Sequence, residues 1–206
     1  MVRHGQTSAS RENRFSGSLD PPLTAVGEAM AQRFAEAYAP LKWDAIYTSP
    51  MLRTRQTADP LCRRVGVQPT VEDGLKEIGY GEWEGLEQDE VKSRWPEAYE
   101  HWSQDVASRG TPGGETAFHV AARAMRVVEA VRSRHEHGNV LLVSHKATLR
   151  VIMCALLGLD VRLFRQRLAQ PVGAVTMFVV TSRGAQLTIF GDRSHLPEEL
   201  KNQEGT

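Results

Sequence analysis

Two histidines and two arginines at widely separated positions are the residues of this sequence best suited to chemistry on an anion: Arg3, His4, Arg53 and His145. A neutral imidazole nitrogen is a competent nucleophile near pH 7, because its ordinary pKa of about 6.5 leaves the ring mostly unprotonated. A guanidinium stays charged and binds two anion oxygens at once. Taken singly, each of these side chains is as readily explained as a capping, hydrogen-bonding or solvated residue.

The predicted secondary structure brings these four residues together. Strands are predicted over residues 45–47 and 140–143, and helices over 24–38, over 52–65, over a stretch ending near 138 and after 145. This alternation predicts an α/β fold, a three-layer α/β/α sandwich with a mostly parallel central sheet. Sites in such sheets gather beyond the carboxyl ends of the strands, so the loops after residues 3, 47 and 143 are expected to converge on one crevice.

The remaining segments are predicted to surround this core within one domain, residues 1–206. Residues 75–112 are rich in Gly, Trp, Glu and Pro with weak periodicity, which indicates loops and short helices inserted over the active crevice. Residues 175–180 and 186–190 form a predicted terminal hairpin, whose apolar edge leaves pairing with a second copy, a homodimer, open. The polar residues from Pro197 onward are expected to fray.

One helix face and the start of the chain give two further expectations. The buried face of the long helix that ends near 138 is predicted to carry Phe118, Ala121, Met125 and Val128. Only two residues precede the Arg3-His4 pair, so the first strand is expected to be completed by a segment upstream.

Composition narrows the class of protein. The 206 residues carry 25 basic and 25 acidic side chains, so there is no global basic field for nucleic acid or an anionic membrane. No apolar run approaches the roughly 18 residues of a membrane span, and no signal peptide is evident. Cys62 and Cys154 lie in apolar helical stretches and are expected to be core residues in a reducing, cytoplasmic compartment.

Six ordered blocks of sequence resemble the histidine phosphatase superfamily, also called the phosphoglycerate mutase-like family. They cover residues 2–7 (VRHGQT), 15–27 (FSGSLDPPLTAVG), 47–58 (YTSPMLRTRQTA), 77–85 (EIGYGEWEG), 112–115 (PGGE) and 143–145 (VSH). A lone Arg-His-Gly would be weak evidence, whereas six blocks in the family's order span nearly the whole chain.

The resemblance implies a role for each matching residue. His4 would be the nucleophile that forms a phosphohistidine, with no metal and no cofactor. Arg3 and Arg53 would hold the phosphoryl oxygens, and His145 would steady charge on the transferring group. Glu77 would give a proton to the leaving oxygen and then help to activate water; Glu82 and Glu84 lie close by, and only the family spacing selects Glu77.

The substrate-binding residues are predicted partly from matches and partly from departures. Ser16 and Gly17 match a turn that places a hydroxyl and a backbone N–H near the phosphate, and Tyr80 lies in the matching fourth block. Where the family often has Trp-Asn this chain has Ala9-Ser10, so Ser10 is expected to replace an amide contact. Lys146 stands where a glycine is common, and either binds a substrate carboxylate or second phosphate or is solvated.

Further residues are candidates for choosing the substrate: Arg11, Arg14, Trp83 and Trp102. The sequence does not select among small phosphorylated metabolites.

The predicted function is hydrolysis of small phosphate monoesters by a phosphatase of the histidine acid phosphatase type. The alternative is a cofactor-dependent phosphoglycerate mutase, which is disfavoured because Arg94 and Arg109 lie apart rather than paired in a longer insertion. A catalytically silent binder of phosphorylated ligands is disfavoured because every residue for phosphohistidine chemistry is present. A metal protein is disfavoured because only His135 and His137 lie close together.

Overall fold

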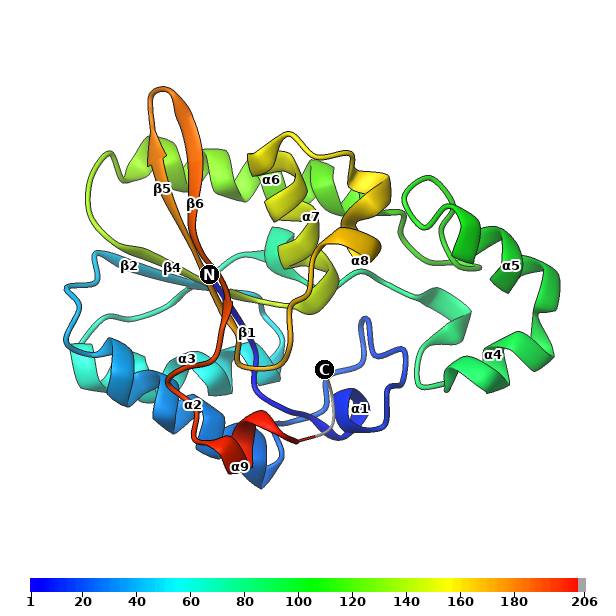
Figure 1. Cartoon of the computed structure of the whole chain (residues 1–206), viewed down its shortest axis with the longest axis horizontal. Helices are drawn as coiled ribbons and strands as arrows, with labels where there is room; N and C mark the ends of the chain where they lie inside the picture. The colour runs from blue at the N-terminus through cyan, green and yellow to red at the C-terminus, as the bar shows by residue number, and fades with distance from the viewer. Residues whose placement is uncertain (204–206) are drawn as a thin grey trace.

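A computed structural model describes residues 1–203 and shows a central sheet with helices on both faces (Figure 1). Within this range the sheet has six strands in the order β3-β2-β4-β1-β5-β6. The strands are β1 (Val2–Arg3), β2 (Ala45–Thr48), β3 (Thr70–Val71), β4 (Val140–Ser144), β5 (Val175–Thr181) and β6 (Gly184–Asp192). The first four strands in that order pair in parallel, whereas β5 runs antiparallel to both β1 and β6.

The longest helices lie on the two faces of this sheet. The helices are α1 (Ser8–Arg11), α2 (Ala25–Tyr38), α3 (Leu52–Val65), α4 (Gln88–Arg94), α5 (Pro96–Gln104), α6 (Ala117–Arg134), α7 (Lys146–Leu157), α8 (Phe164–Arg167) and α9 (Glu198–Lys201), with short 3₁₀ turns at η1 (Asp73–Leu75), η2 (Gly81–Trp83) and η3 (Val161–Leu163). Helices α2 and α3 cover one face, and α6 and α7 cover the other, whereas α4 and α5 lie to one side of the sheet (Figure 1). The predicted α/β sandwich with a mostly parallel sheet is confirmed.

Alternating side chains explain why the sheet is buried on both faces. Ile46 in β2 packs in the same cluster as α2 and α3, whereas its neighbour Tyr47 packs with α6 and α7. In β4, Leu141 faces the first layer and Leu142 the second. Side chains alternate across a strand, so a run of apolar residues fills both cores at once.

Helix α6 corrects the predicted helix face by about one position. Ala117, Val120, Ala124 and Val127 are buried, together with Val128, whereas Phe118 is 48% exposed. The Thr116 side chain caps the helix by accepting from the His119 N–H, which fixes the start and therefore the face turned inward. The predicted spacing followed the largest apolar side chains and so favoured phenylalanine over small alanines.

The chain end also differs from the prediction. Residues from Pro197 on were expected to fray, but Glu198–Lys201 form α9. Leu196 is buried with Met30 and Val172, and Leu200 packs against the same cluster, which holds this segment on α2. Two apolar side chains in an otherwise polar stretch suffice for docking. Residues 204–206 lie outside the described range.

The segment predicted to be an insertion folds around a cluster of aromatic side chains. Trp83 is fully buried, with its ring centroid 5.6 Å from that of Phe15 and 5.3 Å from that of Trp102. Trp83 was predicted as a candidate for choosing the substrate. In the structure it instead packs in the apolar core that supports η2 and α5. Weak periodicity along residues 75–112 reflects this packing on a few large rings rather than on a continuous helical stripe.

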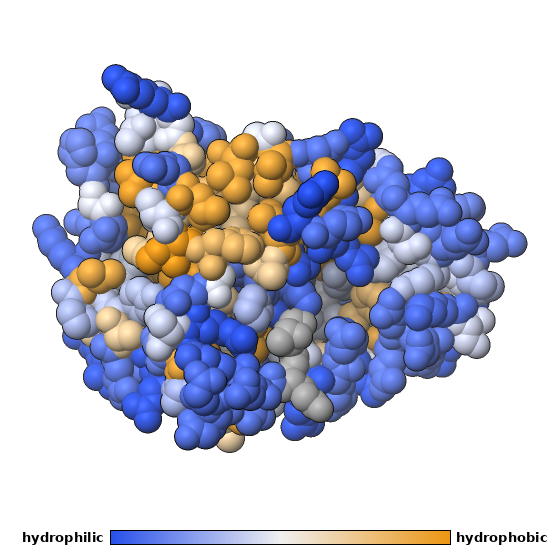
Figure 2. Space-filling view, viewed as in Figure 1, coloured by the Kyte–Doolittle hydropathy of each residue, from blue (hydrophilic) through white to orange (hydrophobic). Residues whose placement is uncertain are grey.

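Two other sequence expectations concern the core and the surface. Both cysteines are buried and free, as predicted for core residues. Figure 2 shows apolar residues gathered on the face that carries the β5–β6 hairpin, where Val179, Val180, Ile189 and Phe190 are exposed. A homodimer through this edge stays a prediction. Among residues 1–203 no helix is both long and apolar enough to cross a membrane.

The loop after β1 is held in place by very close backbone packing on α2. A Cβ added at Gly27 would lie 2.1 Å from the carbonyl oxygen of Gln6, and one added at Gly5 would lie 2.5 Å from the carbonyl oxygen of Gly27. The N–H of Gly5 donates to Thr57 Oγ1 on α3 at 3.0 Å. Only glycines allow the backbone that follows His4 to lie directly on these helices.

We therefore predict that Gly27→Ala lowers stability by about 1–3 kcal/mol, the usual cost of overpacking a core, and reduces activity by displacing the loop after His4. Helix propensity alone would make the Gly27→Ala protein more stable by about 1 kcal/mol. The sign of the change in the free energy of unfolding therefore distinguishes overpacking from helix propensity. Chemical denaturation and phosphate-ester hydrolysis would measure both effects. Gln32→Ala, at an exposed position of the same helix, is the control; a stabilised and fully active Gly27→Ala protein would contradict the argument.

Candidate active site

Segments at the carboxyl ends of the parallel strands line a cleft of about 190 Å³. Arg3 and His4 enter it from the end of β1, and Lys146 and Arg150 enter it from α7, which follows β4. The segment after η1 contributes Glu77. The topology thus brings residues from opposite ends of the chain to one crevice.

His4 is held as a neutral ring with one nitrogen available. Its Nδ1 lies 2.8 Å from the carbonyl oxygen of Gly5, which only accepts, so Nδ1 carries the proton and Nε2 keeps its lone pair. Burial first, and then the charges of Arg53 and Arg3, lower the pKa of His4 well below its ordinary value. The ring is therefore unprotonated at neutral pH, as a nucleophile requires.

Arg3 presents an incompletely paired guanidinium in the same cleft. Its Nη1 donates to the carbonyl oxygen of Gln170 at 2.8 Å, whereas its buried Nε has no hydrogen-bond partner within residues 1–203. Burial lowers the pKa of Arg3 to about 9, so the group stays charged at neutral pH. A buried charge with an unused donor is costly unless an anion completes it, which suits a phosphoryl oxygen.

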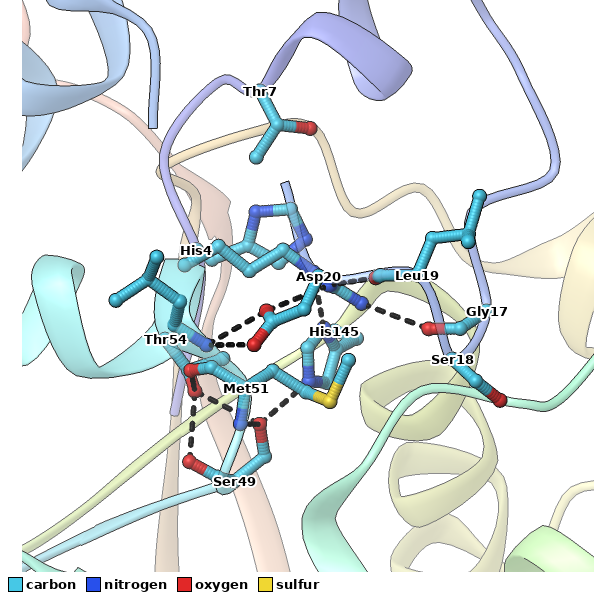
Figure 3. A network of polar contacts seen from close by, with 12 residues as sticks. His4, Thr7, Gly17, Ser18, Leu19, Asp20, Ser49, Met51, Thr54 and His145 are labelled. Carbon is cyan, nitrogen blue, oxygen red and sulfur yellow. Dashed lines mark hydrogen bonds and ion pairs between the residues drawn. The ribbon is translucent and has the colours of Figure 1, made fainter. Parts of the chain in front are cut away.

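Arg53, predicted as a second clamp, uses three of its five N–H donors on protein acceptors. Its Nη1 donates to the carbonyl oxygen of Leu19 at 2.7 Å and its Nη2 to that of Gly17 at 3.1 Å. Its Nε donates to His145 Nδ1 at 3.2 Å (Figure 3). The side chain is 1% exposed and lies outside the cleft lining. In this structure Arg53 binds the 17–20 loop and positions His145, while its charge still acts on His4.

His145 is the centre of a directed chain of hydrogen bonds (Figure 3). Its Nδ1 accepts from Arg53, so the ring proton is on Nε2, which lies 2.8 Å from Ser49 Oγ. Ser49 Oγ lies 2.8 Å from Thr54 Oγ1, and that hydroxyl donates to the Met51 carbonyl at 2.8 Å. Every donor in this series of hydrogen bonds, from Arg53 to the Met51 carbonyl, has an acceptor.

Burial and the charge of Arg53 also decide the charge state of His145, for which the resemblance allowed either a protonated or a donating imidazole. Burial first, then the charge of Arg53, lowers the pKa of His145 well below its ordinary value, so the ring is neutral. Its centroid lies 5.2 Å from that of His4 at an interplanar angle of 61°. Donation from His145 to a phosphoryl group, expected from the sequence, requires the bond to Ser49 to be released, because Nε2 holds the only ring proton.

The Glu77 carboxylate sits at the N-terminus of α7. It accepts from the backbone N–H groups of Ala147 and Thr148, each at 3.2 Å, and from its own neighbour Ile78 at 3.0 Å. The Thr148 hydroxyl adds a contact at 3.3 Å. These donors aim the carboxylate at one place in the cleft, as a group that passes protons to and from a reacting oxygen requires.

The predicted substrate-binding residues divide into two groups. Four of them line the cleft: Ser10, Ser16, Tyr80 and Lys146. Gly17 does not, because its carbonyl accepts from Arg53 and its φ of +28° turns the loop. The Ser10 hydroxyl closes a capping box with Thr7 at the start of α1, which occupies its proton. Burial and Glu77 raise the pKa of Tyr80, so its phenol is a donor at neutral pH.

Of the further candidates, Arg14 and Trp102 line the cleft, whereas Arg11 is exposed and outside it. Ser49, Arg150 and Arg165 were not among the residues predicted from the sequence. Arg150 follows Lys146 by four residues, which places both on one face of α7; that spacing was a readable signal. Ser49 and Arg165 carried none. Within residues 1–203, no three His, Cys, Asp or Glu side chains are grouped so as to hold a metal ion.

Comparison with known proteins agrees with this geometry. Residues 1–193 match the model of the histidine phosphatase superfamily, branch 1. The chain is 34% identical to phosphoserine phosphatase 1 of Hydrogenobacter thermophilus over 164 residues, 80% of this chain and 78% of that one. It is also 34% identical to a glucosyl-3-phosphoglycerate phosphatase of Mycobacterium tuberculosis over 169 residues, 78% of this chain and 75% of that one.

Solved structures give the same answer. Bacillus stearothermophilus YhfR superposes with a TM-score of 0.88 at 30% identity, over 94% of this chain and 96% of that one. A mycobacterial glucosyl-3-phosphoglycerate phosphatase bound to VO3 superposes with a TM-score of 0.85 at 27% identity, over 94% and 98% of the two chains. The protein belongs to the histidine phosphatase superfamily.

The His145 chain predicts that Ser49→Ala costs about 1–3 kcal/mol of stability, because it leaves a buried ring N–H unpaired. Activity should fall with it, since the ring loses its fixed orientation, and Ser49→Thr should restore both. Denaturant unfolding and histidine nitrogen NMR shifts would report stability and tautomer. Thr48→Val is a matched control, because the buried Thr48 hydroxyl oxygen has no partner within residues 1–203. Because Arg53 still donates to Nδ1, the Nε2–H tautomer should persist in Ser49→Ala; a ring proton on Nδ1, or unchanged stability in Ser49→Ala, would refute this account.

The two depressed histidine pKa values also predict a pH dependence of stability. In the unfolded chain each ring takes up a proton below about pH 6.5, whereas the buried ring does so only at lower pH. Stability is therefore complete above about pH 6.5 and falls as the pH drops below it, by up to about 1.4 kcal/mol per pH unit for each histidine. His4→Gln or His145→Gln should each reduce this slope, as measured by urea unfolding between pH 7.5 and 5.5; unchanged slopes would contradict the burial of neutral rings.

Proposed function

We propose that this protein is a metal-independent phosphatase that hydrolyses small phosphate monoesters through a phosphohistidine on His4. One observation carries the proposal: the Gly5 carbonyl fixes the His4 proton on Nδ1, which leaves the lone pair on Nε2, and Arg3 in the same cleft has a buried Nε with no partner within residues 1–203. A nucleophile and a cation for the developing phosphoryl charge thus lie in one cleft.

The reaction proceeds in two transfers. His4 Nε2 attacks phosphorus, the bond from phosphorus to the ester oxygen breaks, and Glu77, when protonated, gives its proton to the leaving alcohol. Water then attacks the phosphohistidine, Glu77 takes a proton from it, and inorganic phosphate leaves with Nε2 restored. Arg3 holds the phosphoryl oxygens in both steps, while Arg53 and His145 set the charge and geometry beside His4.

Three features support the finer assignments. The cleft volume of about 190 Å³ suits a small ester, and the similar phosphatases are named for small phosphorylated compounds. Burial and the charges of Arg53 and Arg3 lower the pKa of His4, so its nucleophile stays unprotonated on the acid side of neutrality, which supports an acid phosphatase-type activity. Two free buried cysteines support a reducing, cytoplasmic setting.

The test is release of inorganic phosphate from a panel of esters in the presence of a chelator. Wild type is expected to release phosphate and to form an acid-labile, base-stable phosphoenzyme, and His4→Ala is expected to lose both by at least about a thousandfold, because no other group replaces the nucleophile. His137→Ala, at an exposed histidine, is the control.

Two results would overturn the proposal. Activity that disappears with the chelator and returns with a divalent metal would remove the metal-independent mechanism. Interconversion of 3- and 2-phosphoglycerate with a bisphosphate primer, without phosphate release, would assign a mutase.

A further inference from the structure

The cleft holds more positive charge than one phosphoryl group requires. Besides Arg14, four cationic side chains line it, Arg3, Lys146, Arg150 and Arg165, against the single carboxylate of Glu77. These four cations and the Glu77 carboxylate together carry a formal charge of +3. Arg14 also lines the cleft, but Glu12 and Glu87 neutralise it at 2.9 and 2.7 Å.

Three of these cations come from the helices α7 and α8, and Lys146 and Arg150 lie close enough to Arg3 for their charges to interact. Lys146 and Arg150 lie one turn apart on α7, and Arg165 comes from α8. The Arg165 guanidinium lies 4.4 Å from the ring centroid of Trp102, which holds it at the cleft. Arg3 instead directly precedes His4 in the chain. The cleft thus has a phosphoryl end at β1 and a second basic wall on α7 and α8.

Burial distinguishes this wall from an ordinary solvated helix face. The Nε of Arg150 is buried and has no hydrogen-bond partner within residues 1–203, as is also true of the Nε of Arg3. Burial and the charges of Arg3 and Arg150 lower the pKa of Lys146 to about 8, so it stays mostly protonated at neutral pH. Like charges brought together out of water are unfavourable until an anion joins them.

We infer that Lys146 and Arg150 form a second anion subsite, which binds a carboxylate carried on the same small skeleton as the phosphoryl group. The inference rests on the proposed function, and it narrows the substrate class to phosphorylated hydroxy or amino acids. The charge balance favours a carboxylate. A phosphate dianion reduces the formal charge of +3 to +1, a carboxylate completes neutrality, and a second phosphate dianion would exceed it.

The planar Arg150 fork and the point charge of Lys146 can share the two carboxylate oxygens. Arg165, exposed at the cleft mouth, adds long-range attraction rather than a defined contact. Lys146 and Arg150 are therefore specificity-determining residues, and neither needs to touch phosphorus. Their loss should weaken the binding of esters that carry a carboxylate and leave other esters nearly unaffected.

Matched pairs of esters test this inference by binding, without turnover. In a His4→Ala background, calorimetry would compare 3-phosphoglycerate with glycerol 3-phosphate, and phosphoserine with phosphoethanolamine; each pair differs by the carboxylate. We expect the carboxylate member of each pair to bind at least roughly tenfold more tightly. Lys146→Gln and Arg150→Gln should each reduce that preference by about tenfold, because each removes a charge-assisted hydrogen bond.

Arg55→Gln is the matched control, because it removes one positive charge at an exposed position of α3 and should leave the preference unchanged. Equal affinity within each pair, or a preference that survives both cleft variants, would overturn the subsite. Tighter binding of propane-1,3-diol bisphosphate than of 3-phosphoglycerate would assign a second phosphate and overturn the carboxylate.

Kinetics separate this inference from the proposed function. Wild-type protein that hydrolyses both members of each pair with equal kcat/KM would keep the phosphatase and remove the subsite. If the protein releases phosphate from no ester, yet binds the carboxylate members with the expected preference, the subsite is supported and the proposed phosphatase function is wrong. With both intact, the substitutions should raise KM for the carboxylate esters about tenfold and change kcat little.

Discussion

The hydrogen bond between His4 Nδ1 and the carbonyl of Gly5 determines which nitrogen of the ring can react. It has that effect only because the ring is buried and neutral, since a protonated ring would offer no lone pair. Burial in turn depends on the close approach of Gly5 and Gly27, which places the loop after β1 directly on α2. A choice of tautomer at one atom thus depends on backbone packing between the sheet and a helix.

The same burial places positive charge where it must be compensated. Arg53 obtains compensation inside the protein, from two carbonyls and from the lone pair of His145. Arg3 and Arg150 each retain a buried Nε without a partner within residues 1–203, and both line the cleft, so each has a donor that a bound anion can use. The three arginines therefore differ in how many of their donors are used by the protein itself.

Sequence patterns predicted the sheet and the convergence of Arg3, His4 and His145, because β-strand ends in an α/β fold fix where such residues go. They placed the buried face of α6 about one residue away and missed α9, because small alanines and isolated leucines carry little periodic signal. They also predicted that Trp83 helps to choose the substrate, although an aromatic cluster across the inserted segment buries it. Contacts between distant loops, such as Ser49 with His145, leave no local pattern to read.

The division of labour in the cleft follows from this topology. His4 and the loop that holds Ser49 lie at strand ends, where the sheet limits movement and a tautomer can be kept. The second basic wall lies on α7 and α8 and is completed by Trp102 from α5, which are elements that cover the sheet rather than form it. Substitution there alters charge at the cleft without moving the strand ends. If the proposed subsite is correct, the fold can keep its phosphohistidine chemistry constant while residues at the positions of Lys146 and Arg150 change the acid or alcohol that is recognised.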